Sequence, residues 1–354
     1  MTSGTETKPD ALMLYGAYGY TGRLVTERAR TLGLQPIIAG RDAARVKALA
    51  DEHALDWRAF PLDGAVDSEL AGVAAVLNMA GPFSRTAAPM VAACLRTGTH
   101  YIDITGEIDI FTALHGHDAA ARAAGVVLLP GAGFDVVPSD CIAAHVHRRL
   151  PGAQSLQIVI GGLNDLSRGT ARTGLESIAA GTAVRRDGEI VRLPKAPRDA
   201  ADFGDGLRPI VGVGWGDVAT AHYSTGIPDI DVFFEASPAL DRAASMPAPV
   251  RAFMGSRLGQ WLGNRAIDRM PPGPNETARR KGRAILIAEA ADAEGNSATA
   301  RLETPEGYRL TAMTALDIAR RVAAGEVAPG YHTPSTAFGP DYILGFPDVA
   351  RRDL

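Results

Sequence analysis

The chain has 354 residues, of which 46% are hydrophobic and 21% charged, and its formal net charge is −4. This length is large for one hydrophobic core and predicts two domains. The composition is typical of a globular protein, and its slightly acidic balance excludes the electrostatic signature of a nucleic-acid partner. No apolar run approaches the ~20 residues that span a bilayer, and no signal-peptide pattern is present. We therefore expect a soluble, cytoplasmic protein without a membrane span.

The first predicted strand leads directly into a glycine-rich turn. Residues 12–15 precede three glycines at three-residue spacing, and a helix is predicted from Thr21 to Leu32. The first glycine suits a tight turn, the second a close approach to a pyrophosphate, and the third a helix packed closely on the sheet. The helix N-terminus would offer unpaired N–H groups to the anion. The predicted dinucleotide contacts in this loop are Gly16, Tyr18, Gly19, Tyr20, Thr21 and Gly22.

The end of the second predicted strand, residues 35–40, bears on the choice between NADP and NAD. A carboxylate at this position binds the ribose 2′-hydroxyl, whereas an arginine accommodates the 2′-phosphate. Arg41 is the first side chain past this strand and Arg45 lies one helical turn further, which favours NADP(H). Asp42 is the alternative, because it would favour NAD if it faced inward. Its other predicted role is to cap the helix over 43–53.

Two further predicted strands, residues 57–63 and 74–83, end in polar or small side chains. Asp63 is placed to touch the adenine, although an aspartate at a strand end also suits a turn. The small residues that end the next strand would let the ribose and nicotinamide lie across the strand tips. Asn78 would hold a ribose hydroxyl or fix the loop. The predicted cofactor contacts outside the glycine loop are Arg41, Asp63, Asn78, Ala80, Gly81 and Thr105.

The remaining elements of the first half alternate between helix and strand. They are helices over 86–97, 110–124 and 141–150, and strands over 99–107 and 126–130. Strand alternation places Tyr101, Asp103 and Thr105 on one face, and Ser139 or Asp140 is expected to cap the last helix. Six strands alternating with helices predict an α/β domain with a doubly wound parallel sheet over residues 1–150.

The pattern changes after Pro151 to strands, hairpins and then helices. Predicted strands cover 155–162, 217–223 and 230–234, and hairpins turn at 187–188 and 294–296. Helices cover 239–270, 310–324 and the residues that follow Thr170 up to about Ala180. The Asp-Gly pair at 187–188 is a strong hairpin signal. This order predicts an α+β domain with a largely antiparallel sheet over 151–329, for substrate binding and dimerisation. The segment 330–354 is expected to pack back on the first domain.

Two pairs of histidines, at 115 and 117 and at 145 and 147, invite a metal interpretation. Positions two apart on a helix point away from each other, so we predict helix-surface histidines and no metal site. Cys94 and Cys141 lie in predicted helices, where they are expected to pack rather than to react or form a disulfide.

Catalytic candidates follow from what hydride transfer requires. A bound nicotinamide supplies the hydride, and the protein orients the substrate and supplies a proton. No tyrosine has a lysine four positions on, which excludes the tyrosine–lysine pair of short-chain dehydrogenases. We expect Arg168 or Thr170 to bind the polar head of the substrate, and Glu107 or Asp135 to transfer protons. Helix capping or loop tethering is the alternative for each carboxylate.

Several motifs together resemble one family. They are Gly16–Gly22, Ala39–Arg41, Asn78–Phe83, Tyr101–Glu107, Pro130–Asp135, Ser167–Thr170 and Gly307–Ala312. With these motifs the chain resembles the saccharopine dehydrogenase-like NADP-binding family, and more narrowly the branch that includes trans-acting enoyl reductases. The resemblance implies a Rossmann domain, an inserted α/β substrate domain, NADP(H) as the cofactor and often a homodimer.

Two functions agree with these observations. The first is an NADP(H)-dependent oxidoreductase that reduces a C=C bond (enoyl or enone) or a C=N bond (imine) of a small-molecule metabolite. The second is a non-catalytic protein that senses NADP(H) or binds a partner through the same glycine loop. A full second domain favours the enzyme, because a sensor needs no dedicated chamber for a substrate.

Overall fold

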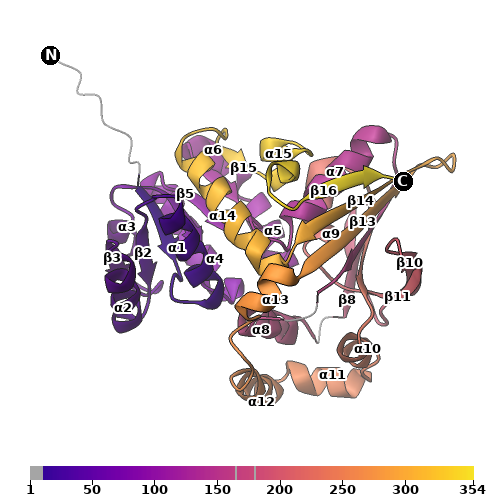
Figure 1. The fold of residues 1–354 in the computed structure, drawn as a ribbon, viewed down its shortest axis with the longest axis horizontal. Helices are drawn as coiled ribbons and strands as arrows, with labels where there is room; N and C mark the ends of the chain where they lie inside the picture. Colours follow the sequence, from indigo (N-terminus) through magenta and orange to yellow (C-terminus); the bar gives the residue numbers. More distant parts are fainter. Residues whose placement is uncertain (1–10, 164–165, 179–180) are drawn as a thin grey trace. The chain divides into compact units, whose positions relative to one another are not determined.

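The computed structural model describes residues 11–163, 166–178 and 181–354 (Figure 1). These residues divide into two compact units. The first contains the chain up to 104 together with 113–132 and 311–332, and the second contains 105–112, 133–310 and 333–354. Each unit has its own sheet, so each is described by itself.

The sheet of the first unit has seven strands among the described residues, in the order β15-β6-β5-β4-β1-β2-β3, and all its pairs are parallel. Its strands are β1 (Ala11–Tyr15), β2 (Ile37–Gly40), β3 (Trp57–Ala59), β4 (Val73–Asn78), β5 (His100–Asp103), β6 (Val127–Leu129) and β15 (Gly330–Tyr331). Each residue of β4 is buried, as expected for a central strand with both faces covered. The predicted doubly wound parallel sheet is confirmed.

Helices connect the strands of the first sheet. They are α1 (Tyr20–Thr31), α2 (Ala43–His53), α3 (Val66–Glu69), α4 (Phe83–Thr97) and α6 (Asp118–Ala124). Asp42 caps α2, because its Oδ1 accepts a hydrogen bond from the Arg45 N–H at 3.1 Å. The helix predicted over 110–124 is interrupted at Gly116 and His117, so that α5 (Ile108–His115) and α6 are separate. Glycine is a poor helix former, which explains the interruption.

The second unit contains a mixed sheet of nine strands among the described residues, and most of its pairs are antiparallel. The strands are β7 (Ser155–Gly161), β8 (Thr182–Arg186), β9 (Glu189–Leu193), β10 (Arg198–Asp202), β11 (Leu207–Gly212), β12 (Asp229–Glu235), β13 (Arg283–Ala291), β14 (Ser297–Pro305) and β16 (Ala350–Asp353). The long pair β13 and β14, coloured orange in Figure 1, forms the predicted hairpin. Val159, Phe203 and Phe233 belong to a buried hydrophobic cluster of this unit. The predicted α+β architecture is confirmed.

The sequence predicted some helices of the second unit less well than those of the first. The helices that contain residues of this unit include α7 (Val137–Arg149), α8 (Arg168–Ser177), α9 (Asp217–Thr225), α10 (Pro238–Ala244), α11 (Ala248–Gly255), α12 (Arg257–Ile267), α13 (Glu276–Lys281), α14 (Gly307–Ala323) and α15 (Pro334–Phe338). Only the first four residues of α14, 307–310, lie in the second unit, and the rest of this helix belongs to the first. The predicted end of α8 near Ala180 lies outside the described residues.

Two predictions about these helices are wrong. Residues 217–223 form the helix α9 rather than a strand, and Gly226 ends it in the left-handed conformation. Neither Ser139 nor Asp140 is an N-cap, because α7 already begins at Val137, with Pro138 in its first turn. Proline favours the first turn of a helix, and this moves the start ahead of the polar residues.

The unit boundaries also differ from the expected ones. The first unit ends its main segment near residue 132 rather than 150, because α7 belongs to the second unit. The C-terminal segment does not pack as one piece on the first domain. Its strand β15 pairs with β6 of the first sheet, whereas β16 pairs with β14 of the second. This pairing of β16 covers a strand edge that would otherwise be open.

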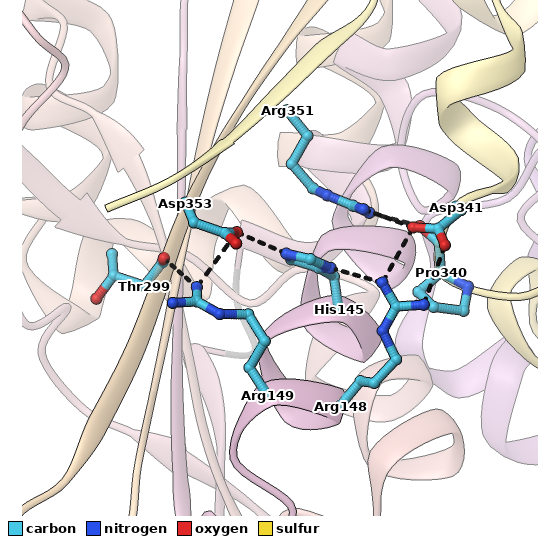
Figure 2. Close-up of polar contacts among 8 residues, drawn as sticks. All are labelled: His145, Arg148, Arg149, Thr299, Pro340, Asp341, Arg351 and Asp353. Carbon is cyan, nitrogen blue, oxygen red and sulfur yellow. Dashed lines mark hydrogen bonds and ion pairs between the residues drawn. The ribbon is translucent and has the colours of Figure 1, made fainter.

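Charged side chains hold the C-terminal segment onto α7 (Figure 2). Arg148 donates two hydrogen bonds to Asp341, at 3.0 and 3.2 Å, and Arg351 contacts the same carboxylate. The Nε2 of His145 lies 2.7 Å from Oδ1 of Asp353. His145 is buried, which contradicts the prediction of a helix-surface histidine. Its position on α7 faces β16, and this could not be inferred from helix periodicity alone.

We expect Asp341→Asn to lower the melting temperature by about 2 °C, the effect of losing about 1 kcal/mol. Arg148 and Arg351 lower the pKa of Asp341 to about 2. A carboxylate with a lowered pKa stabilises the folded state above its unfolded pKa, and this contribution disappears as the pH falls through about 2. The difference from wild type should therefore persist between pH 5 and pH 8. Calorimetry at low salt measures it, and Asp51→Asn, in the exposed pair with Lys47, is the control.

The part of the chain that the structure describes contains no helix both long and apolar enough to cross a membrane. Cys94 and Cys141 are buried in α4 and α7 as free thiols, as predicted. Among the described residues, no three His, Cys, Asp or Glu side chains are grouped so as to hold a metal ion.

Candidate functional site

The turn between β1 and α1 is shaped by glycines that no larger residue could replace. Gly16 has a φ of +82°, and a Cβ there would lie 2.8 Å from the backbone nitrogen of Ala80. A Cβ on Gly22 would lie 2.6 Å from the carbonyl oxygen of Ala17, and it would also collide with that of Gly16. The turn and the first helical turn therefore pack backbone against backbone, as the glycine motif requires.

The N-terminus of α1 is left open by this turn. Gly19 is its N-cap and has no side chain to accept from the first-turn N–H groups, and that turn carries no acidic residue. The N–H groups of a first helical turn, together with the partial positive charge of the helix end, bind phosphate. Gly19, Tyr20 and Thr21 all retain exposed surface. The loop thus fits a pyrophosphate, and its residues would hold that part of a dinucleotide.

Charged side chains gather beside the ends of β1 and β2. Arg41 is exposed directly after β2, and the guanidinium of Arg45 stacks 4.3 Å from the ring centre of Tyr18. Burial raises the pKa of Tyr15 to about 12, with Tyr18 and Asp63 acting in the same direction and Arg41 opposing them. Arg41 follows the end of β2 and Asp63 lies beyond the end of β3, and both act on Tyr15 at the end of β1. Their contacts with a cofactor stay predictions.

Asn78 belongs to a buried network at the ends of β4, β5 and β6. Its Nδ2 donates to the Tyr101 hydroxyl at 3.2 Å, and its Oδ1 accepts from the Ala80 N–H at 3.1 Å. Tyr101 donates to Asp103 at 2.8 Å, and Asp103 accepts from the Gly131 N–H at 3.0 Å. The fully buried Asn78 therefore fixes the loop that contains Ala80. Of its two predicted roles, loop tethering is the one that these contacts support.

The four predicted catalytic residues all lie in the second unit, where Asp135 has the most unusual environment. Its Oδ2 would lie 3.1 Å from a Cβ on Gly106, and its carbonyl oxygen accepts from Trp215 Nε1 at 2.8 Å. Burial raises the pKa of Asp135 to about 7. The residue as a whole nevertheless keeps some exposed surface. A carboxyl group that titrates near neutrality and is accessible can donate and accept protons.

Thr170 and Ser167 form a hydroxyl cluster with Tyr308. Ser167 is the N-cap of α8, since its Oγ accepts from the Thr170 N–H at 3.2 Å. The Tyr308 oxygen accepts from the Ser167 N–H at 2.6 Å and lies 2.9 Å from the Thr170 hydroxyl. Burial raises the pKa of Tyr308, and Asp135 contributes to this shift. Asp135 and the hydroxyl cluster therefore lie within electrostatic range of each other.

Arg168 and Glu107 make contacts that involve the protein backbone. Arg168 Nε donates to the carbonyl oxygen of Met270 at 2.7 Å, which ties the start of α8 to the end of the α12 region. Glu107 lies at the start of α5, where its carbonyl oxygen accepts from Ile110 at 3.0 Å. Thr105 lies beyond the end of β5 and outside the first unit, although the sequence placed it on that strand.

Three residues near this site were not among the predicted ones. Tyr308 lies in the Gly307–Ala312 motif, and this motif could have marked it as a site residue. Its contact with Thr170 could not be predicted, because the two residues are distant in the sequence. Trp215 lies between two glycines, a second signal, and it fixes the backbone of Asp135. Asp217 is fully buried at the start of α9, and burial raises its pKa well above the usual range. It was overlooked because residues 217–223 were predicted to be a strand.

A parallel doubly wound sheet with a glycine turn and an open helix N-terminus defines the first unit as a Rossmann dinucleotide-binding domain. Residues 12–129 match the family model of the saccharopine dehydrogenase NADP binding domain. The resemblance inferred from the motifs and the assignment of NADP(H) as cofactor are confirmed by this match.

Individual proteins are similar over part or all of the chain. A trans-acting enoyl reductase from Mycobacterium leprae is 39% identical over 151 residues, which are 39% of this chain and 36% of that protein. One from Mycobacterium tuberculosis is 34% identical over 154 residues, 39% of this chain and 35% of that protein. The matches span about a third of the length of these relatives. Apo saccharopine dehydrogenase (L-Glu forming) from Saccharomyces cerevisiae shares the fold, with a TM-score of 0.62 and 14% identity over 97% of this chain and 99% of that one.

Proposed function

We propose that the chain is an NADPH-dependent oxidoreductase that reduces a C=C or C=N bond of a small-molecule metabolite. The observation that carries this proposal is the open N-terminus of α1 behind the Gly16 to Gly22 turn, in a domain of the NADP-binding family. The similarity to trans-acting enoyl reductases favours an enoyl C=C bond as the first bond to test. In this proposal the first unit binds NADPH and the second binds the substrate.

The residues of the second unit divide the remaining chemistry between them. NADPH, when bound, supplies a hydride to one atom of the double bond. Asp135 in its acid form donates a proton to the other atom, becomes a carboxylate and is reprotonated from water. The hydroxyl cluster of Ser167, Thr170 and Tyr308 orients the polar head of the substrate by hydrogen bonds. The contacts of Arg168 with the backbone make Thr170 the better candidate for this role.

NADPH consumption over a panel of enones, enoyl thioesters and cyclic imines tests the proposed function. We expect turnover of at least one of these classes with NADPH. Tight NADP(H) binding without turnover of any of them would favour the alternative of a sensor. If calorimetry detects binding of neither nicotinamide coenzyme, both functions are wrong. Light scattering tests the homodimer that the family resemblance implies, and cell fractionation tests the proposed cytoplasmic location.

We expect Arg41→Ala to weaken NADPH binding by about 10- to 100-fold, the effect of losing one charge-assisted hydrogen bond to the 2′-phosphate. NADH lacks this phosphate, so its affinity should remain within about twofold. Titration calorimetry with both coenzymes measures the change. Arg96→Ala is the matched control in the same unit, because its exposed guanidinium pairs with Asp67 instead. An equal loss for NADPH and NADH would contradict the role of Arg41.

A further inference from the structure

The surface of α11 and α12 carries large apolar side chains that face solvent. They are Val250, Phe253, Leu258, Trp261 and Leu262, between 45% and 57% exposed, and together they define the α11–α12 surface. In Figure 1 these two helices lie along the lower edge of the second unit. Single exposed apolar residues are common, but a cluster of large ones marks a site of interaction.

The apolar face of the amphipathic α12 helix points to solvent, whereas such a face is usually buried against the protein. Leu258, Trp261 and Leu262 occupy one helical face and are exposed. The polar side chain of Gln260 instead faces the protein, where its Nε2 donates to the carbonyl oxygens of Leu175 at 2.8 Å and Met254 at 3.0 Å. These bonds anchor α12 to α8 and α11. The apolar face is therefore presented to solvent by the fold itself.

The segment around this surface is strongly basic. Residues 241–283 contain nine Arg or Lys against three Asp or Glu, a net charge of +6 in a chain whose net charge is −4. Two of the three acidic residues, Asp241 and Asp268, are paired with Arg198 and Arg172 from other elements. The guanidinium of Arg265 stacks 4.6 Å from the ring centre of Trp261, so that positive charge lies directly beside the apolar side chains.

We propose that the α11–α12 surface binds peripherally to membranes that contain anionic lipid. Trp, Phe and Leu side chains insert at the boundary of headgroups and acyl chains, while arginines contact the lipid phosphates. A helix that lies in this plane needs no membrane-spanning length. A second copy of the chain is the weaker candidate, because a two-fold contact here would place two basic surfaces against each other. This inference does not depend on the proposed reaction.

Co-sedimentation of the full chain with lipid vesicles tests the proposal. We expect binding to phosphatidylcholine vesicles that contain phosphatidylglycerol, little binding to phosphatidylcholine alone, and weakening as salt screens the charges. Leu258→Ser/Trp261→Ser should weaken binding at least tenfold. Leu32→Ser/Leu207→Ser is the matched control, since both leucines are more than half exposed but lie in other elements. This control should bind like wild type.

A second variant, Arg257→Gln/Arg265→Gln/Arg269→Gln, separates the charge from the apolar contribution. Each arginine near an anionic surface strengthens binding about fivefold (about 1 kcal/mol), so we expect about a 100-fold loss. The proposal is overturned if wild type does not bind anionic vesicles at low salt. It is also overturned if Leu258→Ser/Trp261→Ser binds these vesicles like wild type, because the exposed apolar side chains would then not contribute to binding. Conversion of a dimer to a monomer by that variant would indicate a subunit interface.

Discussion

Gly22→Ala is expected to weaken NADPH binding at least about 100-fold. The added Cβ would lie 2.6 Å from the carbonyl oxygen of Ala17 and would also meet that of Gly16. Both are backbone atoms, so the clash is relieved only if α1 moves away from the turn. This movement would misalign the N–H groups that we propose to contact the pyrophosphate. Losing two charge-assisted hydrogen bonds costs about 3 kcal/mol, which corresponds to about 100-fold in affinity.

The matched control for this experiment is Gly64→Ala in the same unit. A Cβ on Gly64 meets no atom within 4 Å, and its φ is not in the left-handed region. We expect Gly64→Ala to bind NADPH like wild type. Calorimetry measures the affinity, and circular dichroism verifies that Gly22→Ala is folded. A folded Gly22→Ala protein with unchanged affinity would show that the Gly16 to Gly22 turn is not the dinucleotide site.

Asp135→Asn is expected to lower kcat at least about 100-fold, the usual contribution of a general acid. In the wild type, burial raises the pKa of Asp135 to about 7, so the acid form predominates below this pH. Activity should therefore fall about tenfold for each pH unit above 7, because the proton donor is lost. The variant, which has no group titrating there, should lose this limb of the pH profile while KM changes little.

The stability of the same variant provides an internal control. A carboxyl group with a raised pKa destabilises the folded state as the pH rises above its unfolded value, because the buried charge is unfavourable. Asp135→Asn should therefore melt at the same temperature as wild type or higher at pH 8. Glu107→Gln tests the alternative proton donor and should retain most of the activity. Full activity of Asp135→Asn, with the pH profile unchanged, would exclude Asp135 as the acid.

The sequence predicted the first unit well because its signals are local. The glycine spacing from Gly16 to Gly22, the Asp42 cap and the buried strand predicted over 74–83 each involve residues within a few positions of one another. Turn chemistry and hydrophobic periodicity report such short-range preferences directly. The same applies to the two hairpins of the second unit, at 187–188 and 294–296. These features needed no knowledge of contacts between distant segments.

The sequence by itself determined the fold class, the dinucleotide turn and the residue type that suits NADP. The tertiary structure decided which contacts each predicted site residue makes and how deeply it is buried. Tyr308 reaches Thr170 across 138 positions of the chain, and His145 is buried by Asp353 across 208. The outward direction of Trp261 likewise depends on the packing of α12. The burial of Asp135, and hence its pKa, depends on segments that come into contact only in the folded chain. No local sequence pattern predicts such contacts.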